Sequence, residues 1–206
     1  MGNHQASGPD LFKPLLQVRM DQGVREKLSP VNNFQQAAQI RAQADRVHAM
    51  AAQLRTSAEQ GVTPGIAGEL QGMAGVLAQS VGELKATSGM LVGLAQGQFG
   101  AGFGLEMSAN KALLDAHFWR NRIVGDLFCV SSYYRLAAEL LLLAVKTLGK
   151  VTPSSGPMEN SMLLDHAATL LGDAAKQMGT AGTELGEHEA RWQHLEQALA
   201  SHDIGR

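Results

Sequence analysis

The feature of this sequence that most restricts its fold is a seven-residue rhythm of apolar positions, which recurs in four long segments. Alternating steps of three and four residues keep one side of an α-helix against a partner helix. The four segments leave almost no room for β-strands, so the sequence predicts an all-α protein. In the last segment these positions are Leu164, Ala167, Leu171, Ala174, Met178, Ala181, Leu185, His188, Trp192, Leu195 and Leu199.

Turn signals between the periodic segments divide the chain into rods. Ser29-Pro30 interrupts the first rod, because proline disfavours the helical conformation of the residue before it. Thr63-Pro64 begins a helix, with threonine as the N-cap. The expected order is a flexible tail at 1–9 and one helical-bundle domain at 10–203, with helices at about 10–28, 33–60, 64–95, 106–148 and 158–202.

Short linkers between long helices favour antiparallel neighbours. The predicted fold is therefore an elongated antiparallel up-down bundle of four long rods, the first of them broken at Ser29-Pro30. Two adjacent apolar seams in the segment 106–148 mark it as the most buried rod. Cys129 lies in this segment and is the only cysteine of the chain, so we expect a buried structural thiol.

Composition excludes some classes of function. The net charge is −2 and no basic block occurs, so nucleic acid is not an expected partner. The first ten residues have neither a basic n-region nor an apolar h-region, and no segment reads as a membrane span. We expect a cytoplasmic protein, with secretion without a cleaved signal peptide as the alternative.

Aromatic residues gather at one end of the predicted rod. If the helices on either side of the linker 149–157 pack antiparallel, their aromatic residues lie at one end of the rod. The glycine-rich run 97–105 lies at the same end. The opposite end carries few distinctive residues. The candidate interaction residues at the aromatic end are Phe99, Phe103, Leu105, Phe118, Trp119 and Trp192.

The run from Met90 to Leu105 contains sixteen residues without a charge, and several are glycine, aliphatic or phenylalanine. Such a segment at the tip of a helical hairpin can bind a partner or insert into a membrane interface, because exposed apolar patches usually mark interaction sites. It can equally fold back and cap its own bundle, with the glycines supplying tight turns.

His117, His188 and Glu184 are weak candidates for a metal site. The same antiparallel packing brings the two histidines face to face, and Glu184 lies one helical turn from His188. Carboxylate-bridged di-metal bundles need paired Glu-x-x-His motifs, which this sequence lacks. Charged pairs on the segment 106–148 have a simpler interpretation: Arg122 with Asp126, and Arg135 with Glu139, are spaced to pair along one helix.

No motif for a nucleotide, a nucleophile or a cofactor is present, so none is expected to bind. The favoured hypothesis is a non-enzymatic helical-bundle scaffold or adaptor that binds another protein or a second copy of itself. The first alternative is an amphitropic or pore-forming protein that inserts the Met90–Leu105 tip into a membrane surface. The second alternative is a metal-binding bundle enzyme.

Overall fold

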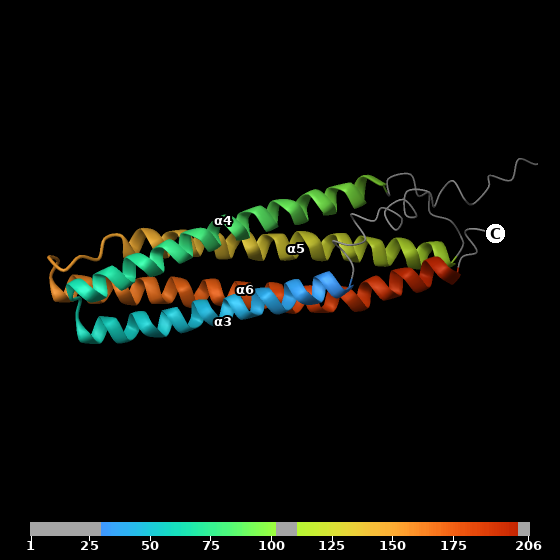
Figure 1. Ribbon diagram of the computed structural model, residues 1–206. Coiled ribbons are helices and arrows are strands. Elements are labelled where there is room, and N and C mark those ends of the chain that lie inside the picture. Colours follow the sequence, from blue (N-terminus) through green and yellow to red (C-terminus); the bar gives the residue numbers. More distant parts are fainter. Residues whose placement is uncertain (1–29, 102–110, 202–206) are drawn as a thin grey trace, which may run out of the picture.

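Four long helices form an elongated bundle in the computed structural model (Figure 1), which describes residues 30–101 and 111–201, apart from some side chains near the helix ends. Successive helices run in opposite directions, so the predicted all-α up-down bundle is confirmed. The expected tail at 1–9 and the expected helix at 10–28 lie outside the described residues. The helices are α3 (Pro30–Gln60), α4 (Pro64–Ala101), α5 (Lys111–Leu148) and α6 (Pro157–Ser201).

Proline begins three of these helices, at Pro30, Pro64 and Pro157. Proline suits this position because its missing N–H would have no partner in the first turn and its ring fixes a helical φ. The backbone N–H of Ile66 donates to the Thr63 hydroxyl at 3.3 Å, which confirms Thr63 as an N-cap. The helix α3 has Pro30 as its first residue, so it begins before the expected start at 33.

The helix α4 continues beyond the expected end at 95 and reaches Ala101. The run it adds contains glycines, each of which costs about 1 kcal/mol relative to alanine, but contains no proline to end the helix. Gly61 ends α3 with a φ of 85°. Glycine adopts this left-handed conformation without a steric penalty, which is why it terminates helices so often.

The helix α6 packs against both α3 and α5, and α4 packs against α5. Within the described residues, α3 and α4 share no such extensive backbone contact, although a short turn joins them. The apolar seam of α6 is buried from Leu164 to Leu185, as its spacing predicts. Both seams of α5 also face the core, and their buried members are Val124, Leu127, Val130, Tyr134, Ala137, Ala138, Leu141, Ala144 and Leu148.

The helix α3 packs tightly against α6 at Gly182. A Cβ atom there would lie 2.7 Å from the Cγ of Arg41, 3.1 Å from the Cγ2 of Ile40 and 3.2 Å from the carbonyl oxygen of Ala37. Arg41 Nη2 also donates to the carbonyl oxygen of Gly182 at 3.0 Å. The absence of a side chain at this position therefore allows the two helices to approach each other.

A pair of serines joins α4 to α5. Ser88 and Ser131 are buried, and their hydroxyl oxygens lie 2.9 Å apart. The Ser88 hydroxyl donates to the carbonyl of Ser131 at 3.0 Å. The Ser131 hydroxyl donates to the carbonyl of Ser88 at 3.1 Å. The two buried hydroxyls are thus paired across the contact between α4 and α5.

We expect Gly182→Ala to lower the free energy of unfolding by about 1 kcal/mol. Overpacking against Ile40 and the α3 backbone costs about 2 kcal/mol, and the gain in helix propensity offsets about 1 kcal/mol of it. Gly179→Ala on the same helix is the matched control, because its Cβ would meet nothing within 4 Å. The control should gain up to about 1 kcal/mol. Urea unfolding measures both, and equal stabilities would show that the close approach at Gly182 is unimportant.

Candidate functional site

A charged cluster formed by Asp126, His188 and Arg191 is buried between α5 and α6. His188 is 1% exposed and Asp126 is 6% exposed. Arg191 Nη1 lies 2.6 Å from Asp126 Oδ1, and His188 Nδ1 lies 3.8 Å from Asp126 Oδ2. The contact between Arg191 and Asp126 is a close ion pair rather than an aligned hydrogen bond. We call these three residues the buried charged cluster.

Burial by itself raises the pKa of Asp126, since it disfavours the charged form. His188 and Arg191 outweigh this effect, and the pKa of Asp126 lies below its ordinary value. Asp126 in turn raises the pKa of Arg191, against the opposing effect of burial. Asp126 therefore stays ionised at neutral pH and ties α5 to α6.

Two further carboxylates surround the guanidinium of Arg191. Glu187 Oε2 lies 2.8 Å from Arg191 Nη2, and Glu184 Oε2 lies 3.6 Å from Arg191 Nη1. Arg122 approaches Asp126 at 4.0 Å, so this predicted pair on α5 is present at the limit of an ion-pair distance. The site is thus a network of opposite charges with Arg191 at its centre.

The metal hypothesis placed His117, His188 and Glu184 together. In the structure His188 faces Asp126, and Glu184 faces Arg191. His117 lies in α5, but its side chain is outside the description. Among the side chains that the structure describes, which do not include that of His117, no group of three or more histidine, cysteine, aspartate or glutamate residues is placed to hold a metal ion.

His188 and His117 were expected at the same level, and this expectation is wrong. His188 lies opposite Asp126, which is more than two helical turns along α5 from His117. The linker explains the shift, because it packs along the first turn of α6 instead of forming a symmetric turn. The Asn160 side chain donates to the carbonyl of Thr152 at 2.8 Å and accepts from its N–H at 3.4 Å.

The interaction residues predicted at the aromatic end are only partly described. Phe118 lies on α5 and is 60% exposed. Phe99, Trp119 and Trp192 belong to α4, α5 and α6, but nothing is described of their side chains. Phe103 and Leu105 lie outside the described residues.

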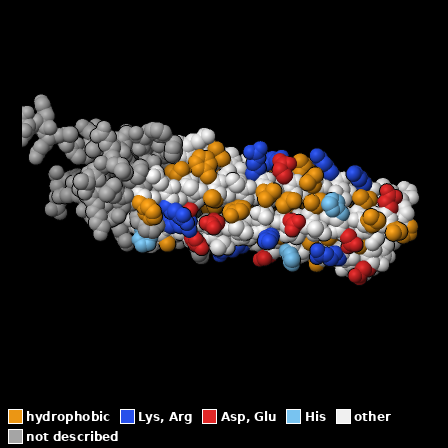
Figure 2. Space-filling view, turned by 180° about the vertical axis from the view of Figure 1, so that it is seen from behind, with side chains coloured by type: hydrophobic (Ala, Val, Ile, Leu, Met, Phe, Trp, Pro, Cys, Tyr) orange, Lys and Arg blue, Asp and Glu red, His pale blue; other side chains and the backbone are white. Residues whose placement is uncertain are grey.

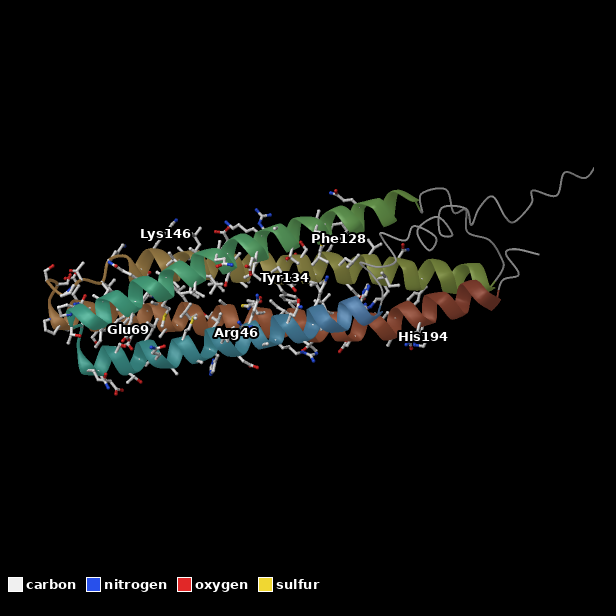
Figure 3. All side chains as sticks on the ribbon, viewed as in Figure 1. Arg46, Glu69, Phe128, Tyr134, Lys146 and His194 are labelled. Carbon is white, nitrogen blue, oxygen red and sulfur yellow. The ribbon has the colours of Figure 1, made fainter. Side chains whose placement is uncertain are left out.

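The face of α5 that points away from the bundle is unexpectedly apolar. Phe118, Phe128, Leu136 and Leu143 are large hydrophobic side chains and all are exposed (Figure 3 labels Phe128). Cys129 is exposed too, so the predicted buried thiol is wrong. Cys129 lies three turns from Phe118 and therefore points to the same side. These five residues form what we call the outer stripe.

The second predicted pair on α5 is replaced by a contact between helices. Glu139 pairs with Lys85 of α4 at 2.8 Å, and this partner lowers the pKa of Glu139. Arg135 contributes to the lowering only through its more distant charge. The pair lies beside the outer stripe and is itself about half exposed.

The space between α3 and α4 holds two cavities of about 230 and 270 Å³. They lie along α3 from Gln36 to Met50, and we call this space the α3–α4 groove. Tyr134, labelled in Figure 3 near the middle of the bundle, lines the smaller cavity. Burial raises the pKa of Tyr134 to about 12. The buried floor of the groove consists of Ile40, Val47, Leu77, Leu84 and Tyr134.

Sequence reasoning missed both surfaces for a definable reason. Position along the heptad rhythm identifies the buried side of each helix, but does not say which helices stay apart. The outer stripe has its own signal, since Phe118, Leu136 and Leu143 repeat at whole numbers of turns on the side opposite the seams.

Comparison of the chain with known protein families, with curated proteins and with solved structures gives no match.

We expect Asp126→Asn to lower the free energy of unfolding by about 2 kcal/mol at pH 7, because Arg191 loses its closest charged partner while Glu184 and Glu187 remain beside it. The lowered pKa means that the ionised Asp126 stabilises the fold above the ordinary pKa of 3.8. This contribution is lost as the pH falls through the lowered pKa, so the difference from the wild type should shrink in acid.

Urea unfolding at pH 7 and at pH 3 measures both effects. Glu139→Gln is the matched control, because it breaks an exposed ion pair on the same helix and should change the stability far less. Equal losses for the two variants would contradict the structural role of the buried charged cluster.

Proposed function

We propose that this protein is a non-enzymatic interaction module, a helical scaffold or adaptor that binds another protein or a second copy of itself through the outer stripe. The observation that carries the proposal is the exposure of Phe118, Phe128, Leu136 and Leu143 on one helix. Full burial of such a side chain contributes about 1.5 to 3 kcal/mol, and each of the four is about half exposed, so covering them would add roughly half of this amount per residue.

The spacing of the outer stripe indicates the shape of the partner. Phe118, Leu136 and Leu143 follow one line along α5, which extends for about 38 Å at 1.5 Å per residue. A line of apolar side chains at helical spacing fits the apolar face of another helix, which packs its own side chains between them. We therefore expect the partner to contribute an amphipathic helix.

The charges around the outer stripe support a specific contact rather than nonspecific hydrophobic association. Lys85 and Glu139 form an exposed pair beside it, and Arg122 lies near its upstream end. An apolar centre with a polar edge is the usual composition of a protein interface. Figure 2 shows another feature of the surface: on one face of the bundle, hydrophobic side chains alternate with patches of charge along its length.

A photo-reactive amino acid at Leu136 tests the proposal in an extract of the cells that make the protein. We expect a discrete cross-linked product, and we expect Phe118→Ser with Leu143→Ser to abolish it, since these side chains are exposed and their loss should spare the fold. The matched control places the same amino acid at Met162, which is also exposed but lies on the first turns of α6. Products of the same pattern and yield at both positions would rule out a specific role of the outer stripe.

A membrane-active function is the second candidate, and one observation favours it. In the described part of the chain, Asn121–Leu148 is long and apolar enough to cross a membrane, judged by length and composition alone. The core helix of a water-soluble bundle has the same character, and 39% of the apolar window is buried. The uncharged Met90–Leu105 segment is the other element that this function would use.

Flotation of the purified protein with liposomes, with and without anionic lipid, separates the two candidates. An interaction module should stay at the bottom of the gradient in both cases. A membrane-active protein should float, and Phe99→Ser with Phe103→Ser should then prevent flotation if the tip is the anchor. Flotation that survives this change but is lost in the Phe118→Ser, Leu143→Ser protein would assign membrane binding to the outer stripe instead.

A further inference from the structure

The α3–α4 groove has the lining that suits an amphipathic helix. Its floor is apolar and buried, whereas its edges carry exposed polar side chains such as Gln39, Gln79 and Glu83. The two cavities lie in line along α3, from Gln36 to Met50, over about 21 Å at 1.5 Å per residue. The groove exists because α4 packs against α5 and makes little contact with α3.

We propose that residues 11–28 of the same chain form a helix that occupies the α3–α4 groove. This stretch directly precedes α3, which begins at Pro30 and forms one wall of the groove. As a helix it would extend for about 27 Å, which is enough to cover both cavities. A reversal of the chain at Ser29-Pro30 is all that the connection requires, and proline favours a turn there.

The connection also fixes which residues face each other. A segment that reverses at Ser29-Pro30 runs antiparallel to α3, so Val18 comes level with Gln43, and Leu11 comes level with Met50. Leu11, Leu15 and Val18 follow steps of four and three residues and share one helical face. They therefore lie opposite the larger cavity.

The larger cavity offers these three side chains apolar neighbours. Val47, Met50 and Leu77 line it, and the side chains of Val47 and Leu77 belong to the buried core. The charges agree as well, because Arg19 lies next to Val18, which comes level with Gln43, and both Gln43 and Glu83 line the two cavities. Glu83 is exposed and accepts a hydrogen bond from Gln79 at 3.0 Å, so its carboxylate stays at the edge of the groove.

Paramagnetic broadening in the full-length protein tests this arrangement. A nitroxide is attached at Gln17→Cys in a Cys129→Ser background, a position off the face that Leu11, Leu15 and Val18 share. We expect the amide signals of Gln43 and Val47 to be lost. The amide signal of Leu164, near the α5–α6 linker, should be retained.

Two further samples complete the test. Adding Leu15→Asp and Val18→Asp to the labelled protein should restore the signals of Gln43 and Val47. If these signals are present from the start, or if the two aspartates leave the broadening unchanged, the proposal is wrong. A mixture of isotope-labelled protein without nitroxide and unlabelled protein with nitroxide should keep the amide signals of Gln43 and Val47. Loss of these signals in the mixture, to the same extent as in the singly labelled protein, would show that the segment of a second copy occupies the groove.

Discussion

The packing of α6 against both α3 and α5 is the interaction on which the rest of the structure depends. The seam of α6 is rich in alanine, and Gly182 lacks even a Cβ atom where α3 packs tightly against α6. Small side chains bury little area each, so the helices must lie close together over a long distance to form a core. The length of the rods and the close approach at Gly182 are two consequences of the same composition.

Most of the fold could be predicted from the sequence, because burial follows the heptad rhythm. The positions from Leu164 to Leu185 on α6, and both seams of α5, are buried as expected. The rhythm carries no information about the relative heights of two helices. The hydrogen bonds of Asn160 to Thr152 lay the linker along α6, and this moves His188 from the level of His117 to that of Asp126.

Less of the candidate site could be predicted, since it depends on contacts between helices. The spacing of Arg122 and Asp126 indicated a pair along α5, but the stronger partner of Asp126 is Arg191 of α6. Cys129 was assigned to the core because its surroundings in the sequence are apolar, whereas its phase on the helix places it outside. Average hydrophobicity identifies an apolar helix, but only the angular position of each residue says which of its sides is buried.

Within residues 30–101 and 111–201, the extensive contacts connect the four helices in the order α3, α6, α5, α4, and no comparable contact between α3 and α4 closes this series into a ring. A closed bundle must break two interfaces to release any one helix, whereas an open series releases a terminal helix by breaking one. Local opening therefore costs least at α3 and α4 and most at α5 and α6, each of which has two neighbours. The described bundle therefore has two edges, at α3 and α4, and the helix proposed for residues 11–28 would lie across both of them and resist their opening.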